Sequence, residues 1–509
     1  MDDTGTGPEP IAGGFDRANY DLGVDLHIGL AGTADLAGQI YRQVRESVLD
    51  GRLRPGEALP PSRELAVRLR VSRNTVVSAY DRLVAEGFLT TRIGAGTFVS
   101  TLQVSGRPAG SAPPDREQGA GEGQLRPRSL WDDIVIPGDM SAARRYDFRV
   151  GAPDARLFPY ATWRRLLSRQ LRATAVGVGM PCEPAGHWGL RVALSRHLKV
   201  SRGVDTTADD VVVTSGIQQA LDVIGRVLLE PGACAAIEEP GYFVPWLAWR
   251  LLGARVVGVP VDQEGLVVDA LPDDARLVYV TASHQFPTGV AMSLRRRMAL
   301  LAWAQRHDAA IVEDDYDSEF RYTDQTLEPL HSLDTHGRVL YVGSFSKILL
   351  PTLRVGFLVA PPSLRPALHV AKFVADWHTS LPTQAALAEF VDQGALGRHL
   401  RRVRGQYRLR HDRIAAALAG PLAPWLELIP SAAGLHVGAY FRRAPGTDLD
   451  AFRASTAAAD VEVFDFSQVS GLGPSRPGLV FGYGAIPVDR VDEGLRRVEQ
   501  CLRATMPIP

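Results

Sequence analysis

The sequence predicts a large α/β domain around a mainly parallel sheet, with a small domain of three helices and a hairpin before it. Three observations support this fold class. Short apolar runs alternate with helical periodicity from about residue 148 onward, which is typical of strands that alternate with helices. A compact periodic stretch precedes them, and a Gly-, Pro- and Ser-rich stretch separates the two.

The composition excludes several classes of protein. With 45% hydrophobic and 22% charged residues and a formal net charge of −1, the chain is an ordinary globular protein, so any basic surface must be local. No signal peptide and no apolar run of membrane-spanning length is present. Cys182, Cys234 and Cys501 lie far apart and form no CxxC pair. We therefore expect a protein of the reducing cytoplasm with no membrane partner and no metal site.

The composition also divides the chain into four segments. Residues 1–35 are rich in Gly, Asp and Thr at first and form an N-terminal extension, and residues 36–100 form the small domain. Residues 101–145 bury too little apolar surface to offset the entropy of ordering, so we interpret them as a flexible linker. The large domain then covers residues 146–509.

The small domain begins with two predicted helices. Leu36, Ile40, Val44 and Val48 recur at four-residue steps and predict a first helix that ends near Gly51. A second helix is expected after Pro60 and Pro61, with Ser62 as its N-cap. Both helices would bury an apolar stripe.

A third helix is expected from the N-cap Ser72 to Gly87. Its outer face would carry polar side chains, with Arg73 in the first turn and Asn74, Thr75, Ser78 and Arg82 along the helix. Two helices joined by a short turn, the second with a polar and basic face, form the helix-turn-helix that enters a major groove. A small helical domain with solvated polar faces is the simpler alternative.

A hairpin should follow, because Gly94 and Gly96 permit a tight turn between residues 88–92 and 97–99. Such a turn would reach a minor groove as the wing of a winged helix-turn-helix. Residues 36–100 carry ten basic against six acidic side chains, a net charge of +4, so positive charge is concentrated where we expect DNA contact.

The amino-acid sequence of this domain closely resembles that of the GntR family of winged-helix regulators. The matching stretches are Leu59–Ala66, Val71–Val76 and Gly94–Val99. The resemblance implies that the following residues contact double-stranded DNA, the last three of them as the wing tip: Arg63, Ser72, Arg73, Asn74, Thr75, Gly94, Gly96 and Thr97.

In the large domain, Lys347 follows a predicted strand and lies among hydroxyl side chains. Its amine is suited to a Schiff base with a cofactor aldehyde, and Ser344, Ser346 and Arg354 point to a bound phosphate. A lysine beside two serines is by itself most often a surface feature. Three other segments strengthen the interpretation.

The first segment is a buried strand that runs into Ser215-Gly216 and a helix, which offers backbone N–H groups to a phosphate. The second is Glu313-Asp314-Asp315-Tyr316 at the end of a buried strand, where an ionised aspartate can keep a pyridine nitrogen protonated. The third is the turn 284–289. Taken singly, the first is a capped helix and the third only a loop.

In this order and spacing, the segments resemble fold-type I aminotransferases over most of residues 148–505. The resemblance implies pyridoxal 5'-phosphate as cofactor, with Lys347 in the Schiff base, Asp314 rather than Asp315 on the pyridine nitrogen and Tyr316 on the phenolic oxygen. It further implies that Tyr242 stacks on the ring. The implied phosphate ligands are Ser215, Gly216, Ser344 and Arg354. His284 or Gln285 would replace the asparagine that the family carries just before Pro-Thr-Gly.

The order of the two domains is similar to the MocR/GabR subfamily of GntR regulators. That resemblance implies a head-to-tail homodimer in which a small-molecule effector changes the spacing of the two DNA-binding domains. We expect a transcription regulator whose large domain senses pyridoxal phosphate or an amine. The alternative is a catalytically active aminotransferase with an accessory DNA-binding domain.

The chain also departs from the aminotransferase pattern. The segment Leu479–Ala485 lacks the arginine that holds the substrate carboxylate, and Pro181 stands where the family has a tyrosine. No arginine stands directly beside Tyr242, although Arg250 is near in sequence. We therefore expect little or no amino-acid turnover and an effector with few acidic groups.

Overall fold

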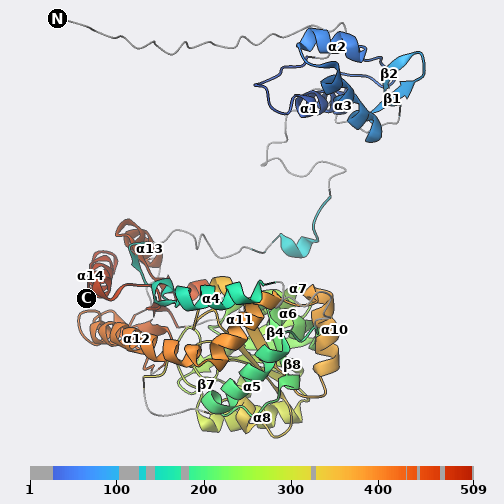
Figure 1. The fold of residues 1–509 in the computed structure, drawn as a ribbon. Coiled ribbons are helices and arrows are strands. Elements are labelled where there is room, and N and C mark those ends of the chain that lie inside the picture. Colours follow the sequence, from blue (N-terminus) through green and yellow to red (C-terminus); the bar gives the residue numbers. More distant parts are fainter. Residues whose placement is uncertain are drawn as a thin grey trace, which may run out of the picture. The chain divides into compact units, whose positions relative to one another are not determined.

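The computed structural model describes residues 27–101, 125–132, 134, 144–172, 183–322, 328–431, 433–443, 448–469 and 476–506. The chain divides into two compact units, Met1–Arg128 and Ser129–Pro509, which we describe separately (Figure 1). Most of the predicted extension and linker, together with Pro181 and Cys182, lies outside the described residues. A described part of the linker includes a short 3-10 turn, Ser129–Trp131.

The first unit has the predicted winged-helix architecture. Its elements are α1 (Leu36–Leu49), α2 (Ser62–Leu69), α3 (Arg73–Ala85), β1 (Leu89–Arg92) and β2 (Gly96–Val99). The strands pair antiparallel, with Arg92 opposite Gly96. The core consists of apolar residues from every element, among them Ile40, Val44, Leu65, Leu69, Val76, Leu83, Leu89 and Val99. The Tyr80 hydroxyl donates to the Pro60 carbonyl (3.0 Å), which joins α3 to the start of α2.

One local expectation in this unit was wrong. The N-cap of α2 is Pro61 rather than Ser62, because the Leu65 N–H already bonds the Pro61 carbonyl and Ser62 lies inside the helix. Arg82 is exposed, as predicted, and it also contacts α1. Its guanidinium lies 3.9 Å from the centre of the Tyr41 ring and pairs with Glu86 (3.0 Å), so α1 holds it.

The second unit contains an eight-stranded, mainly parallel sheet. Its strands, in spatial order, are β4 (Val211–Thr214), β11 (Gly356–Val359), β10 (Val339–Ser344), β9 (Ala310–Asp314), β8 (Ala275–Val280), β5 (Cys234–Glu239), β6 (Arg255–Asp262) and β7 (Gly265–Leu266). Only β11 and the edge strand β7 run antiparallel to their neighbours. The short apolar runs at residues 211–213, 278–280, 310–312 and 339–342 lie in β4, β8, β9 and β10.

Helices cover both faces of this sheet. They are α4 (Tyr160–Gln170), α5 (Trp188–Arg202), α6 (Ile217–Leu228), α7 (Phe243–Leu251), α8 (Leu294–Arg306), α9 (Leu330–Leu333), α10 (Arg365–Asp376) and α11 (Leu381–Asp392). Successive residues of β4 enter different cores: Val211 and Val213 pack with α5, whereas Val212 packs with α6. Burial on both sides explains why these strands are continuous apolar runs.

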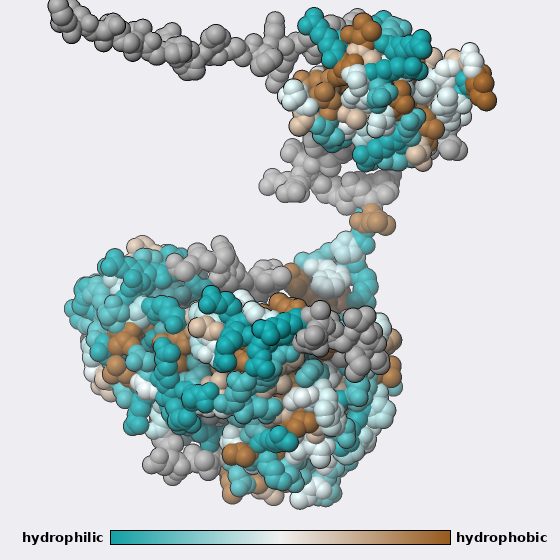
Figure 2. Space-filling view, in the orientation of Figure 1, coloured by the Kyte–Doolittle hydropathy of each residue, from teal (hydrophilic) through white to brown (hydrophobic). Residues whose placement is uncertain are grey.

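The C-terminal part builds a smaller sheet with the order β12-β13-β16-β15. Its elements are α12 (Ala395–Ala419), β12 (Leu426–Leu428), β13 (His436–Phe441), α13 (Asp448–Ala458), β14 (Val461–Glu462), β15 (Phe464–Asp465), β16 (Gly478–Gly482) and α14 (Val488–Thr505), and β14 pairs with β3 (Tyr146–Asp147). Among the described helices, none is long and apolar enough to cross a bilayer. The visible surface of both units is largely hydrophilic, with small hydrophobic patches (Figure 2).

Candidate functional site

The pairing register of the strands brings residues that are distant in sequence together at one end of the strands of the large sheet. Gly356 of β11 pairs with Thr214 at the end of β4 and with Ser344 at the end of β10. Val342 of β10 pairs with Asp314, the last residue of β9. The residues that follow these strand ends therefore lie close to one another, at the carboxyl ends of the parallel strands, where open α/β sheets bind ligands.

Ser215, Gly216 and Arg354 meet at the start of α6. The Arg354 guanidinium donates to the Ser215 carbonyl (2.7 Å). Gly216 has φ +81°, and a Cβ built on it would lie 2.9 Å from Arg354 Nη2, so a larger residue would displace the arginine. The fold thus gathers a guanidinium and the N-terminus of a twelve-residue helix, both favourable for an anion.

Ser344 and Lys347 follow on β10 and the turn after it. The Ser344 hydroxyl accepts from the Ser346 N–H (3.0 Å). The Lys347 amine donates to the Gly151 carbonyl (2.8 Å), and a Cβ on Gly151 would lie 2.5 Å from that amine. Burial lowers the pKa of Lys347. A lysine that loses its proton easily is a better nucleophile toward a carbonyl carbon.

Asp314 is buried and has no cation at hydrogen-bond distance. Its Oδ2 accepts from the Tyr279 hydroxyl (2.6 Å), while Oδ1 has no hydrogen-bond partner among the described residues. Burial raises the pKa of Asp314 to about 7. The Tyr279 hydrogen bond and the charge of Lys347 oppose this rise, but no described cation bonds the carboxylate, so Oδ1 is left for another partner.

Asp315 differs from its neighbour in charge compensation. Arg202 forms a buried ion pair with it (2.6 Å), and the Tyr341 hydroxyl also donates to it. Burial would raise the pKa of Asp315, but Arg202 and these hydrogen bonds together lower it. Oδ1 is unpaired in Asp315 as well, so the cation, not the count of hydrogen bonds, separates the two aspartates.

We predict that Asp315→Asn lowers the free energy of unfolding of the large unit by about 3 kcal/mol, because the buried Arg202 guanidinium loses its counter-charge. Urea unfolding measures this. Asp205→Asn is the control, since Asp205 pairs with Lys199 at the surface and its loss should leave the unfolding midpoint unchanged. Equal midpoints for both variants and the parent protein would contradict the prediction.

His284 and Tyr316 form a connected unit. The Tyr316 hydroxyl donates to the His284 carbonyl (2.9 Å). Both ring nitrogens of His284 already have partners: Nδ1 faces the Asp317 carboxylate (3.1 Å) and Nε2 the Ser431 hydroxyl (3.0 Å). His284 thus fixes the position of Tyr316, and its ring has no free nitrogen with which to replace an asparagine.

Gln285 is equally occupied. Its amide nitrogen donates to the Pro240 carbonyl (2.8 Å), and its oxygen accepts from the Thr288 hydroxyl (2.6 Å). These bonds hold the turn that leads into Pro287. The residue directly before Pro287 is Phe286, an apolar side chain.

Tyr242 is the N-cap of α7, and Arg250 lies in the last turn of that helix. Tyr242 is half-buried, with its ring 6.2 Å from Phe286 at an interplanar angle of 86°, and burial raises its pKa. Asp314 and Arg354 are among the charges that act on Tyr242, so the tyrosine belongs to the same surroundings. Arg250 lies over the Trp246 ring at 5.2 Å.

A buried arginine lies beside the C-terminal segment, although the segment itself contains none. Arg410 of α12 donates to the carbonyls of Tyr483 (3.1 Å) and Gly484 (2.7 Å) and pairs with Asp154 (2.6 Å). Its guanidinium therefore serves to fasten α12 to this segment. Only the tertiary structure reveals it, because Arg410 is 73 residues away in sequence.

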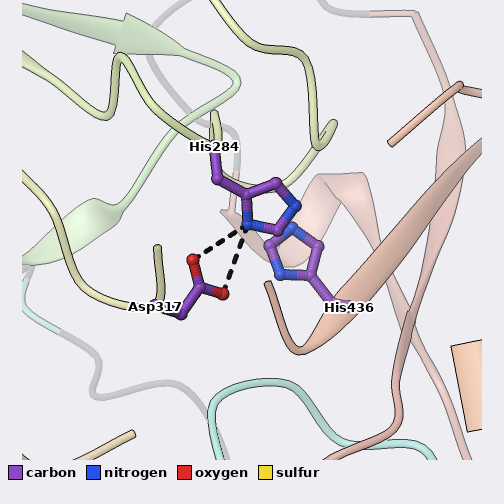
Figure 3. Close-up of side chains that lie close together, drawn as sticks. All are labelled: His284, Asp317 and His436. Atoms are coloured by element: carbon purple, nitrogen blue, oxygen red, sulfur yellow. Dashed lines mark hydrogen bonds and ion pairs between the residues drawn. The ribbon is translucent and has the colours of Figure 1, made fainter. Parts of the chain in front are cut away.

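Sequence reasoning missed a group of buried side chains beside Tyr316. Figure 3 shows His284, Asp317 and His436 with their polar ends together. Their potential ligand atoms lie within 4.8 Å of one another, which among the described residues makes this the one group suited to a metal ion. The Asp317 carboxylate also accepts from the Leu435 N–H (3.0 Å). The run of four acids between residues 313 and 317 was the only signal in the sequence.

In the small unit, the predicted DNA-contacting residues lie at the start of α2, at the start of α3 and on the wing. Arg63, Arg73 and Asn74 are exposed, and Thr75 is partly exposed. The Ser72 hydroxyl caps α3 by accepting from the Thr75 N–H (3.1 Å). Nothing lies within 4 Å of a Cβ built on Gly94 or Gly96, so the wing tip is open.

Comparisons with known families agree with this architecture. The family of bacterial regulatory proteins, gntR family, matches residues 36–99, and the family of aminotransferases, class I and II, matches residues 147–466. The two domains thus define a transcription regulator with a helix-turn-helix and an aminotransferase fold.

Full-length relatives name the subfamily. The chain is 36% identical over 476 residues to the probable rhizopine catabolism regulatory protein MocR of Rhizobium meliloti, covering 92% of this chain and 93% of that one. It is 32% identical over 447 residues to the pyridoxine biosynthesis transcriptional regulator PdxR of Corynebacterium glutamicum, covering 88% and 91%. The chain therefore belongs to the MocR/GabR subfamily of GntR regulators.

Solved structures share the fold of the large unit. The kynurenine aminotransferase of Pyrococcus horikoshii, determined with PMP, superimposes with a TM-score of 0.66 at 27% identity, covering 72% of this chain and 92% of that one. The aminotransferase class I and II fold is thus one that holds a pyridoxal-type cofactor.

Proposed function

We propose that this protein is a pyridoxal-phosphate-dependent transcription regulator that binds an operator through its small unit and an effector through its large unit. The observation that carries the proposal is the combination of an exposed, polar α3 in one unit with a buried, uncompensated Asp314 near Lys347 in the other. Because its operator would be chromosomal DNA, we expect a cytoplasmic protein.

The site residues fit pyridoxal phosphate. The unpaired Oδ1 of buried Asp314 suits the pyridinium N–H, and Lys347 offers a buried amine for the aldehyde. Ser215, Gly216, Ser344 and Arg354 would hold the phosphate, while Tyr316 would contact the phenolic oxygen and Tyr242 the ring face. When bound, the cofactor supplies a reactive aldehyde and an electron-withdrawing ring. We propose that His284, which was predicted as a cofactor ligand, instead positions Tyr316.

We further propose that the effector is the cofactor itself or an amine with few acidic groups, acting on a head-to-tail homodimer. Nη1 and Nη2 of Arg410 are already used by backbone carbonyls and by Asp154, which leaves only Nε without a partner among the described residues, so the guanidinium offers a carboxylate no second hydrogen bond. Exposed apolar residues on α10 and just after it, Val370, Phe373, Val374 and Trp377, favour an interface on that helix. An effector regulates only if it binds one arrangement of the dimer better than another.

The test is a DNA-binding titration with the full-length protein and fragments upstream of its own and neighbouring genes, with and without pyridoxal phosphate. We expect sequence-specific binding whose log affinity falls linearly with log salt, with a slope of roughly −0.9 for each phosphate contact. The cofactor should change the affinity or the footprint. Binding that does not depend on salt, or that shows no preference for any fragment, would contradict the proposal.

The alternative is an active aminotransferase, favoured by the proximity of Lys347 and Asp314. Incubation of the cofactor-loaded protein with a panel of α-amino acids and an oxo-acid separates the two. Rapid turnover of a common amino acid would favour the enzyme, and we expect none.

A further inference from the structure

His436 opens strand β13 and carries a buried ring nitrogen that has no partner. The residue is 2% exposed, and its Nε2 has no hydrogen-bond partner among the described residues. Buried polar atoms in native proteins are nearly always paired, so an unpaired one needs an explanation such as a ligand or an ordered water.

Neighbouring rings fix the orientation of His436. The His284 ring lies 4.4 Å away at 38°, the Tyr316 ring 6.5 Å away at 11°, and the Phe286 ring 5.5 Å away at 75°. Figure 3 shows the His284 and His436 rings next to each other, with the Asp317 carboxylate facing His284. All three neighbours follow strands β8 and β9, whose ends also carry Asp314. His436 therefore stands among the residues of the candidate cofactor site.

The surroundings of His436 also determine which of its two ring nitrogens carries the proton. A hydrogen bond to the Pro287 carbonyl is among the influences on the His436 imidazole, and because Nε2 has no partner among the described residues, we assign that bond to Nδ1. A carbonyl can only accept, so the proton resides on Nδ1 and Nε2 presents a lone pair. Burial, followed by the charges of His284 and Lys347, lowers the pKa of His436 well below its ordinary value. The ring is therefore neutral.

We propose that Nε2 of His436 accepts a hydrogen bond from the effector and so selects a ligand with a neutral donor, such as a hydroxyl, over one with a carboxylate. A carboxylate oxygen and the imidazole nitrogen would face each other with two lone pairs and no proton between them. The inference rests on the proposed function, because it concerns the effector that the large unit senses.

A metal ion is the competing explanation for this group of side chains. Against it, both nitrogens of His284 are engaged by Asp317 and Ser431, and Asp317 is engaged by His284 and the Leu435 N–H. Within this group, only Nε2 of His436 has no partner among the described residues. A metal ion needs several ligand atoms, so this single nitrogen is better suited to accept a hydrogen bond.

Calorimetric titration of the full-length, cofactor-loaded protein tests the proposal with three amines of similar size: 2-aminoethanol, propylamine and glycine. They differ in offering a hydroxyl donor, a methyl group or a carboxylate. We expect 2-aminoethanol to bind roughly tenfold more tightly than either of the others.

The measured quantity is the ratio of the dissociation constants of two amines for the same variant. A general structural defect would weaken the binding of both amines and leave this ratio unchanged. His436→Phe keeps a ring but removes the acceptor, and should bring the ratio for 2-aminoethanol and propylamine to about one. His436→Gln retains an acceptor and should keep part of the preference. His331→Phe is the matched control, because His331 Nδ1 is also buried and unpaired but lies on α9 beside Glu313.

Equal affinities for the three amines, or tightest binding of glycine, in the parent protein would overturn the inference while leaving the proposed function intact. Tight binding of Zn²⁺ alone that His436→Gln abolishes would overturn it in favour of a metal site. If the purified protein takes up no pyridoxal phosphate, both the inference and the proposed function fail.

Discussion

Lys347→Ala is expected to abolish the visible absorbance of the pyridoxal-phosphate-loaded protein. That absorbance would come from the covalent bond between the Lys347 amine and the cofactor aldehyde, and no other lysine can replace it. The chain has only two others: Lys372 is fully buried and paired with Asp376, and Lys199 is exposed. The effect is all or none. An absorption spectrum after gel filtration measures it.

Lys199→Ala provides the control, since it removes an amine of the same kind from a surface ion pair and should leave the spectrum unchanged. The Lys347→Ala protein should still retain some cofactor noncovalently through Arg354 and Asp314. A visible band of parental position and intensity in Lys347→Ala would show that the cofactor is attached elsewhere or not attached at all.

The double variant Arg63→Ala/Arg73→Ala is expected to weaken operator binding by roughly a hundredfold or more. Each arginine would contact a phosphate or a base edge, and such contacts contribute about 1–3 kcal/mol each. If both contact phosphates, the slope of log affinity against log salt should also fall by about two. Fluorescence anisotropy with a labelled operator fragment at several salt concentrations measures both quantities.

A second double variant, Arg496→Ala/Arg503→Ala, removes the same charge from exposed ion pairs on α14 in the large unit. Its operator affinity should stay within about twofold of the parent, because a screened surface charge outside the contact region contributes little. Equal losses in the two double variants would mean that net charge, rather than the recognition helix, governs binding.

Local patterns in the sequence were sufficient for the fold of both units. The apolar run Val211–Val213 is a strand buried on both faces, and Ser72 caps α3 as predicted. Gly94 and Gly96 form the hairpin turn. These features depend on residues that are close in sequence, so the sequence alone determines them.

The prediction of Lys347 as the cofactor lysine also rests on local sequence, but the roles of the residues around it could not be predicted in that way. Adjacent aspartates at a strand end look alike in sequence, and only the contact with Arg202, 113 residues from Asp315, distinguishes them. His284 was expected on the cofactor, yet Ser431, 147 residues away, occupies its second nitrogen.

By itself, then, the sequence determined the two domains, their order and the strand and helix pattern, and it predicted Lys347 as the cofactor lysine. Only the tertiary structure decided which carboxylate remains uncompensated, that α1 holds Arg82, that Arg410 is already paired and that His436 presents a free nitrogen. The physical reason is that backbone conformation follows from neighbours along the chain, whereas charge compensation and hydrogen-bond satisfaction depend on partners that folding brings from remote segments.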